Sequence, residues 1–186
     1  MPGPRLYAFH KPRGAICSRV REGGAPTVFE LLAEPFCNWF AVGRLDKDSE
    51  GLLLFADDAR LAQRLMDPGL VAKTYLVTVR GLPDDEALTA VREGGLVIDG
   101  KPVGPAQARR LGKAPRGGTR LEVVLHEGRN RQIRRSFATL GFRVRRLARV
   151  AIGTVVLGTL PVGQGRELTA AEVRDLIADP ARQRRD

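Results

Sequence analysis

The chain has few of the residues on which many metal sites and nucleophilic sites are built. Its 186 residues include 2 cysteines, 1 tryptophan and 2 histidines. Neither Cys17 nor Cys37 has a second thiol or a histidine nearby at the spacing of metal ligands. We therefore expect no metal site. Both cysteines are expected to be small buried apolar side chains rather than a disulfide or a nucleophile.

Long apolar runs are also missing. No stretch approaches the roughly 20 consecutive apolar residues that a membrane-spanning helix needs, and the start of the chain lacks the apolar run of a secretory signal. Hydrophobic residues make up 43% and charged residues 28% of the chain, which disfavours a disordered or fibrous protein. We expect a cytoplasmic protein without a membrane partner. We also expect a monomer, because no exposed apolar stripe is evident.

The scarcity of histidine limits the catalytic possibilities. His10 and His126 neighbour no serine or cysteine in a nucleophile-elbow pattern, so a hydrolase triad has little support. A glycine-rich phosphate loop of the Walker or dinucleotide type is absent as well. What remains is the chemistry of a carboxylate in a basic protein.

Positive charge is what the chain has in excess. It carries 31 basic and 21 acidic residues, a formal net charge of +10 that favours a polyanionic partner. No acidic residue occurs from Arg129 to Arg166. A solvated basic face would normally contain acids, so we favour contact with nucleic acid over such a face and over a membrane surface. Eight arginines lie in the first part of this segment: Arg129, Arg131, Arg134, Arg135, Arg143, Arg145, Arg146 and Arg149.

Periodicity and turn signals predict more strands than helices. Strands are expected at residues 6–10, 15–19, 40–45, 52–55, 75–80, 97–98, 121–125, 143–151 and 155–160. Helices are expected after capping residues near 27, 57–58, 84, 130 and 169. The expected class is α+β, with a mixed, mostly antiparallel central sheet and flanking helices. Residues 1–178 should form one domain with an internal seam at 111–118, and residues 179–186 a polar tail.

In the helix expected at residues 130–140, the angle of each side chain around the helix axis can be worked out, since each residue turns about 100°. Ile133, Phe137 and Leu140 fall on one face, which must be the core side. Arg131 and Arg135 point nearly opposite, toward solvent or phosphate. Arg134 lies at the boundary, where an arginine can lean into a cleft.

Asp46 is the carboxylate with an unusual setting. It follows a predicted strand and opens the loop 46–51, so two strands brace it. From composition alone, an ordinary loop or capping aspartate is the favoured interpretation.

Four motifs give this chain a family resemblance. The run GRLDKDSEGLL at residues 43–53 resembles the signature of the RsuA-type family of RNA pseudouridine synthases. Residues 6–18 with KPRG, KTYLV at 73–77, and EGRNRQIRR at 127–135 with LARVAIG at 147–153 agree with that family in order and spacing. The match runs from about residue 6 to residue 172. His10 departs from the family's usual Asn.

Within the family, the chain is most similar to the E-type synthases, which act on large-subunit ribosomal RNA. The similarity rests on the motif EGRNRQ at residues 127–132. It also rests on our expectation that no S4-type RNA-binding domain precedes the first motif. The resemblance implies the pseudouridine synthase catalytic fold, with two lobes of residues 1–178 around one cleft. It also implies ribosomal RNA as the partner.

The implied reaction breaks the glycosidic bond of a uridine, turns the uracil and rejoins it through C5, without cofactor or metal. The resemblance makes Asp46 the catalytic residue, either attacking the nucleotide or removing a sugar proton. Arg134 would pair with this aspartate, because an ionised carboxylate in a closed pocket needs a cation. Tyr75 would stack on the base, although a core tyrosine is its ordinary interpretation. Leu147 would confine the detached uracil.

The other arginines are expected to hold RNA phosphates while the target nucleotide is flipped out. Arg44 would do this or brace its loop. The remaining candidates are Arg129, Arg131, Arg135, Arg143, Arg145, Arg146 and Arg149. Two alternatives stay open: a non-catalytic RNA-binding or ribosome-assembly protein on the same fold, and a glycosidase-like hydrolase, which needs a second catalytic carboxylate.

Overall fold

The computed structural model describes residues 3–178, which fall into two compact units. Unit 1 consists of the chain up to Val71 and from Arg149 onward, and unit 2 runs from Ala72 to Ala148. The predicted seam at residues 111–118 is wrong. Those residues form the end of one strand, a turn and the start of the next strand in unit 2, so their Gly, Lys and Arg belong to a hairpin. The predicted tail at 179–186 lies outside the described residues.

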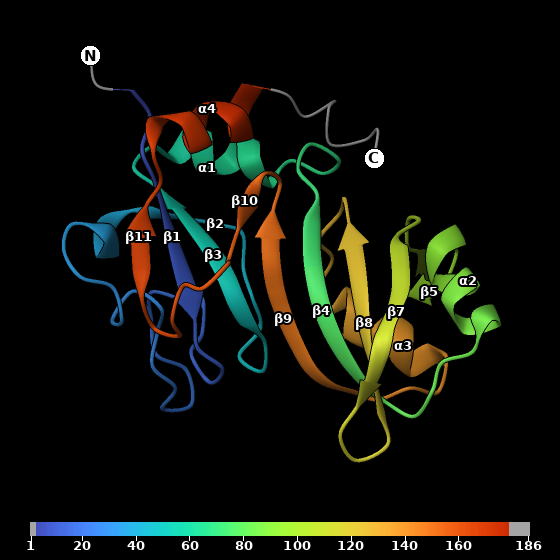
Figure 1. Ribbon diagram of the computed structural model, residues 1–186. Coiled ribbons are helices and arrows are strands. Elements are labelled where there is room, and N and C mark those ends of the chain that lie inside the picture. Colours follow the sequence, from blue (N-terminus) through green and yellow to red (C-terminus); the bar gives the residue numbers. More distant parts are fainter. Residues whose placement is uncertain (1–2, 179–186) are drawn as a thin grey trace. The chain divides into compact units, whose positions relative to one another are not determined.

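Unit 1 contains a sheet with strand order β11-β1-β3-β9, in which β2 also pairs with β3 and β10 with β9 (Figure 1). The pairs β1–β11, β1–β3, β2–β3 and β9–β10 are antiparallel. The strands are β1 (Leu6–Lys11), β2 (Phe40–Val42), β3 (Glu50–Ala56), β9 (Val144–Ile152), β10 (Val155–Val156) and β11 (Gly165–Glu167). Strand β9 belongs to unit 1 from Arg149 onward.

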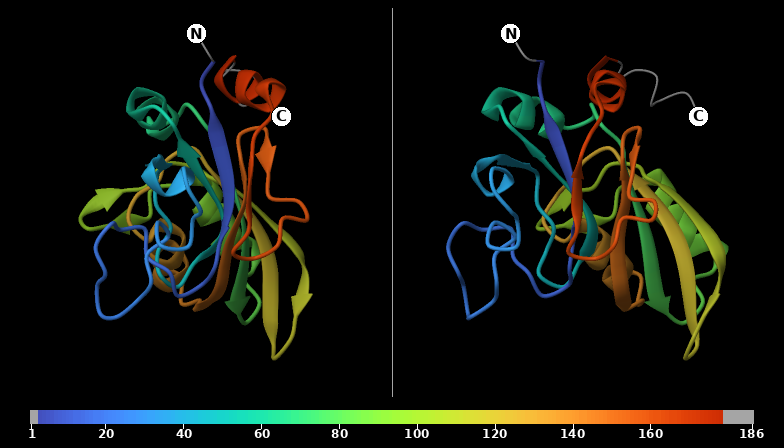
Figure 2. Two further views of the ribbon diagram at one scale, coloured as in Figure 1. Left: turned by 90° about the vertical axis from the view of Figure 1, so that its left-hand side faces the viewer. Right: turned by 60° about the vertical axis from the view of Figure 1, so that its left-hand side comes forward.

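Two apolar clusters form the core of unit 1, one for each set of alternate residues in β1. Leu6 and Ala8 pack with residues of the helices α1 (Ala59–Met66) and α4 (Ala170–Ala178). Figures 1 and 2 show both helices at the end of the sheet where β1 begins. Tyr7 and Phe9 pack with the irregular segment between β1 and β2, which includes the short 3-10 helix η1 (Phe36–Asn38).

Unit 2 contains the first part of β9 in the order β9-β4-β8-β7. Its other strands are β4 (Lys73–Arg80), β7 (Gln107–Ala114) and β8 (Gly118–Leu125), and the pairs β4–β8 and β7–β8 are antiparallel. Helix α2 (Asp85–Glu93) contacts β7, and α3 (Gln132–Thr139) contacts the small hairpin of β5 (Val97–Ile98) and β6 (Lys101–Pro102). The predicted α+β class with a mostly antiparallel sheet is confirmed.

Several element predictions hold because their caps form. Asp58 accepts a hydrogen bond from the Leu61 amide at the start of α1, and Asp84 accepts one from the Ala87 amide at the start of α2. In α3, the predicted core residues Ile133 and Phe137 are buried, whereas Leu140, predicted on the same face, caps the helix and is only half-buried. Within residues 3–178, no helix has the length and apolar character needed to cross a membrane.

The helix predicted after Thr27 does not form, although its capping box does. The Thr27 amide donates to Glu30 Oε2 at 2.8 Å, and the Glu30 amide donates to Thr27 Oγ1 at 3.2 Å. After the box the Leu31 amide bonds to the Val28 carbonyl, three residues before it, so the segment is a turn rather than an α-helix.

One predicted strand does not form, the strand predicted at 155–160 is reduced to β10 (Val155–Val156), and β7 was missed. Residues 15–19 form no strand, and only Ile16 makes an isolated bridge, with Thr27. Strand β7 was not predicted, because most of its side chains are exposed and its sequence QARRLGKA shows no apolar alternation.

Candidate active site

Asp46 lies on the loop that connects β2 to β3 in unit 1, here called the Asp46 loop (residues 43–49). Asp46 itself is half-buried. Its neighbours Leu45 and Ser49 are buried, and the Ser49 amide donates to the Asp46 carbonyl at 3.0 Å. The loop is therefore a closed turn anchored on both sides of the aspartate.

Lys11 supports this turn from the end of β1. Its side chain is fully buried, and its Nζ donates to the carbonyls of Ser49 at 2.7 Å, Asp46 at 3.1 Å and Pro12 at 3.1 Å. Three carbonyl oxygens match the three donors of an ammonium group. Burial lowers the pKa of Lys11, while nearby negative groups act in the opposite direction. The main chain on both sides of the catalytic candidate is thus tied to one buried cation.

The segment after Lys11 contacts the Asp46 loop as well. The Gly14 amide donates to the Lys47 carbonyl at 2.8 Å, and the Leu45 amide donates to Cys17 Sγ at 3.4 Å. The first two family motifs therefore meet in unit 1. Cys17 and Cys37 are free thiols, but both are half-buried rather than buried as predicted.

Two predicted arginines of unit 1 have different settings. Arg44 is exposed at the start of the Asp46 loop. Arg149 is 2% exposed, and its guanidinium donates to the main-chain carbonyls of Leu52 and Arg44. A side chain buried in this way does not present its charge to an RNA phosphate, so the prediction that Arg149 contacts RNA is corrected here.

Tyr75, Arg134 and Leu147 lie in unit 2. Tyr75 is 8% exposed on the buried side of β4, and Leu147 is 6% exposed on the adjacent strand β9. Half-buried Arg134 of α3 donates through Nη1 to the Val144 carbonyl of β9 at 3.4 Å. Two adjacent strands and one helix of unit 2 thus carry these residues. Their assigned roles stay predictions.

A polar network shapes the turn before α3. Glu127 Oε1 accepts hydrogen bonds from Gln132 Nε2 at 2.6 Å and from the Gly104 amide at 2.8 Å. Glu127 Oε2 pairs with Arg129 Nε at 3.3 Å, and Gln132 Oε1 accepts from the Arg129 amide. The EGRNRQ motif is therefore an internally bonded turn with Arg129 on its exposed side.

The remaining arginines predicted to contact RNA divide into two half-buried side chains that bond within unit 2 and three exposed ones. Arg135 makes a forked ion pair with Asp99 of the β5–β6 turn, and this hydrogen bonding lowers the pKa of Asp99. Arg145 donates to the Arg116 carbonyl at 3.0 Å. The side chains in exposed positions are those of Arg131, Arg143 and Arg146.

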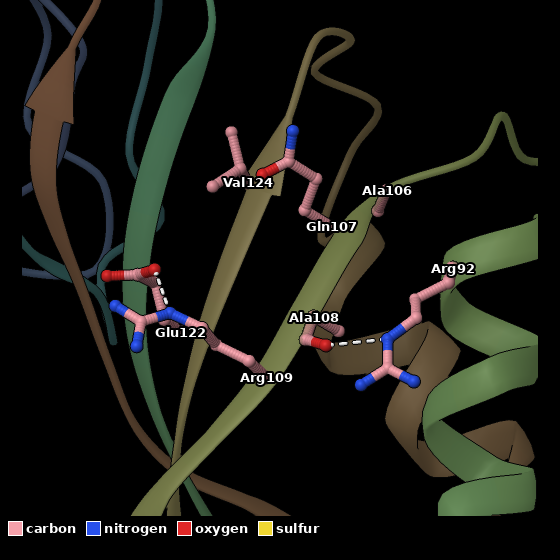
Figure 3. Close-up of a pocket in the computed structure, with 7 residues that line it drawn as sticks. All are labelled: Arg92, Ala106, Gln107, Ala108, Arg109, Glu122 and Val124. Carbon is pink, nitrogen blue, oxygen red and sulfur yellow. Dashed lines mark hydrogen bonds and ion pairs between the residues drawn. The ribbon is translucent and has the colours of Figure 1, made fainter. Parts of the chain in front are cut away.

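A pocket of about 330 Å³ lies elsewhere in unit 2, among α2, β7 and β8 (Figure 3). Arg92 donates to the Ala108 carbonyl at 2.8 Å, and Arg109 pairs with Glu122 at 2.7 Å. None of its lining residues is a predicted site residue. Across residues 3–178, no group of three or more His, Cys, Asp or Glu side chains is placed to hold a metal ion.

Comparison with known proteins places the chain in a family. The family model described as RNA pseudouridylate synthase matches residues 5–139. The chain belongs to this family. It is 47% identical over 187 residues to ribosomal large subunit pseudouridine synthase E of Xanthomonas campestris pv. campestris, covering 91% of this chain and 98% of the relative. It is 36% identical to ribosomal large subunit pseudouridine synthase B of Bacillus subtilis, covering 94% of this chain and 72% of the relative.

Solved structures of pseudouridylate synthases have the same fold. A crystal structure of a pseudouridylate synthase aligns with a TM-score of 0.82 and 31% identity, over 95% of this chain and 75% of that one. Human RNA pseudouridylate synthase domain containing 1 aligns with a TM-score of 0.58 and 17% identity, over 80% of this chain and 74% of that one, and shares the fold alone. The predicted family, fold and isomerase class are confirmed.

Lys11 belongs to the first family motif, but its sequence context alone predicts no role for it. The alternation of side chains along β1 gives a signal for Lys11. Its side chain points to the same side of the strand as those of Tyr7 and Phe9, which are buried. A lysine on the buried side of a strand needs acceptors, and here they are loop carbonyls.

Proposed function

We propose that this chain isomerises a uridine of large-subunit (23S) ribosomal RNA to pseudouridine, with Asp46 as its catalytic residue. The observation that carries the proposal is the Asp46 loop, whose main chain is bonded to the buried Lys11. A fixed loop that presents one carboxylate is what a single-residue mechanism requires, because the reacting groups must be held in place. The names of the relatives support ribosomal RNA of the large subunit as the substrate.

The proposed reaction is an isomerisation that needs only a few further side chains beside Asp46. The bond between N1 and the sugar breaks, the uracil turns, a bond from C5 to the sugar forms, and one proton moves in net from C5 to N1. In the proposal, Asp46 reacts with the nucleotide or its sugar, Tyr75 stacks on the base, and Leu147 confines the detached uracil. Arg134 is proposed to balance the charge of Asp46.

Binding of the RNA is assigned to the excess of positive charge. The exposed arginines Arg131, Arg143 and Arg146 are proposed to contact phosphates, with Arg44 and Arg129 as further contacts. An enzyme of this kind must extrude the uridine from its stack, and phosphate contacts hold the RNA during that step. A monomeric state and a cytoplasmic location remain part of this proposal.

The substitution Asp46→Asn tests the proposal, because it keeps the shape of the side chain and removes its charge. We expect pseudouridine formation in 23S RNA from cells lacking this protein to fall to background, while RNA affinity changes little. Release of tritium from uridine labelled at C5 measures the first, and filter binding the second. Equal activity in the variant would contradict the role of Asp46.

Asp48→Asn is the matched control, since Asp48 is an exposed acid on the same loop. We expect it to keep activity. Release of free uracil in place of pseudouridine by the wild-type protein, lost in both variants, would favour the hydrolase alternative, which uses two carboxylates. Unchanged RNA binding with no pseudouridine from the wild-type protein would favour the non-catalytic binder.

A further inference from the structure

Arg149 is a buried arginine at the point where β9 enters unit 1. Its side chain is 2% exposed. Its Nε donates to the Leu52 carbonyl at 2.8 Å, and its Nη1 donates to the Arg44 carbonyl at 3.5 Å. Arg44 lies at the start of the Asp46 loop and Leu52 lies in β3 just after it. One guanidinium therefore joins the two sides of the loop.

The main chain of Arg149 also packs closely against Gly51, at the end of the Asp46 loop. Gly51 has φ +108°, and a Cβ atom there would lie 2.7 Å from the Arg149 nitrogen and 2.9 Å from its carbonyl carbon. Both distances are shorter than van der Waals contact allows, so only glycine permits this approach. The side chain and the backbone of Arg149 thus fix the same end of the loop.

Stability alone does not account for a guanidinium in this place. Its hydrogen-bond acceptors, the carbonyl oxygens of Leu52 and Arg44, are neutral, and within the described part of the chain its Nη2 is buried without a hydrogen-bond partner. A desolvated charge with such partners is poorly compensated, and well-packed apolar residues often serve stability as well or better. The arrangement points to the function of the loop that Arg149 holds.

We propose that Arg149 is a positioning residue for the isomerisation. By bridging the carbonyls of Arg44 and Leu52, it sets the two sides of the loop, while Lys11 holds its middle. The Asp46 carboxylate then keeps one position when RNA is bound. This inference rests on the proposed catalytic role of Asp46. A misplacement of about 1 Å can slow an enzyme about 10²-fold, so the bridge affects the rate on bound RNA rather than the affinity.

The variants Arg149→Met and Arg149→Lys test the bridge. Arg174→Met is the matched control, because Arg174 is an exposed arginine of α4 in the same unit. We expect Arg149→Met to lower the single-turnover rate at saturating 23S RNA about 10²-fold with RNA affinity unchanged. Arg149→Lys should have an intermediate rate, because a compact ammonium lacks the planar fork that bridges two carbonyls. The control should match the wild type.

Amide hydrogen exchange without RNA gives a readout that does not depend on activity. The Ser49 amide bonds to the Asp46 carbonyl and the Gly14 amide to the Lys47 carbonyl, so both report on the order of the loop. In Arg149→Lys we expect both amides to exchange faster, while amides of the paired strands β1 and β3 keep their wild-type rates. Faster exchange throughout unit 1 would indicate a structural role alone and would overturn the proposal.

The remaining outcomes are also decisive. A wild-type rate in Arg149→Lys would overturn the proposal, even if Arg149→Met fails to fold. A parallel fall in rate and RNA affinity would make Arg149 an RNA contact instead, and would overturn it too. Absence of pseudouridine from the wild-type protein contradicts the proposed function. An active wild type with equally active Arg149 variants contradicts only the role of Arg149.

Discussion

The ammonium group of Lys11 donates a hydrogen bond to the main-chain carbonyl of Asp46. The bond joins residues 35 positions apart and places a fully buried cation against the backbone of the catalytic candidate. A second bond from the same ammonium to the Ser49 carbonyl spans the turn. The position of the Asp46 side chain therefore depends on a contact with its backbone by a residue outside its own motif.

Lys11→Met should destabilise the protein and alter its pH dependence. The change removes the Lys11 donor from the buried Ser49 carbonyl, whereas the Asp46 carbonyl keeps its bond from the Ser49 amide. A buried group left unsatisfied costs about 1–3 kcal/mol. Because burial lowers the pKa of Lys11 below 10.5, the unfolded state binds this proton more tightly than the folded state. The contribution of Lys11 to stability therefore rises as pH increases from its folded pKa toward 10.5.

Urea unfolding of both proteins at neutral pH and near pH 10 measures this effect. The wild type should gain stability relative to Lys11→Met as the pH rises. A constant difference between the two proteins across that range would show that the Lys11 proton is not linked to folding.

Gly51→Ala should destabilise unit 1 through the contact with Arg149. The left-handed backbone costs a non-glycine residue about 1–2 kcal/mol, and overlap of the new methyl with main chain adds about 1–3 kcal/mol. Gly23→Ala is the control, because Gly23 also has positive φ but has open space around it. It should show only the backbone cost. Equal losses of unfolding free energy in the two variants would contradict the close approach of Gly51 to Arg149.

The sequence predicted elements whose signals are local, and it missed contacts whose partners are distant. Ile133 and Phe137 were placed correctly because helical periodicity alone assigns them to one face. Arg149 was assigned to RNA because it ends a run of arginines, yet its acceptor on Leu52 is 97 positions away. The alternation of side chains along β9 indicated burial, because Arg149 points to the same side of the strand as the apolar Leu147.

The two capping boxes of the chain show that a local signal can form without the element that it predicts. The box at Thr27 forms both of its hydrogen bonds but starts no helix, whereas the box of Thr169 and Glu172 is followed by α4. The box satisfies only the first amides of a helix, and the residues that follow decide whether the next turn can form.

The paired substitutions Arg131→Asn and Arg135→Gln test how RNA is bound. Arg131 is exposed and has positive φ, a conformation that asparagine tolerates. Arg135 is half-buried and makes a forked ion pair with Asp99. We expect Arg131→Asn to weaken binding across RNA sequences and to reduce the slope of log affinity against log salt by about one contact. Arg135→Gln should change that slope by less than one contact, because Asp99 balances part of its charge and the side chain is half-buried.

Filter binding at several salt concentrations measures both slopes, and turnover of bound RNA should be largely kept in both variants. A larger loss of salt dependence in Arg135→Gln would mean that RNA displaces Asp99 from Arg135, and that the ion pair is a feature of the RNA-free protein. Loss of turnover without loss of binding in either variant would place that arginine at the chemistry. Two measurements, on the N-cap residue Arg131 and on Arg135 within α3, thus separate phosphate contact from catalysis.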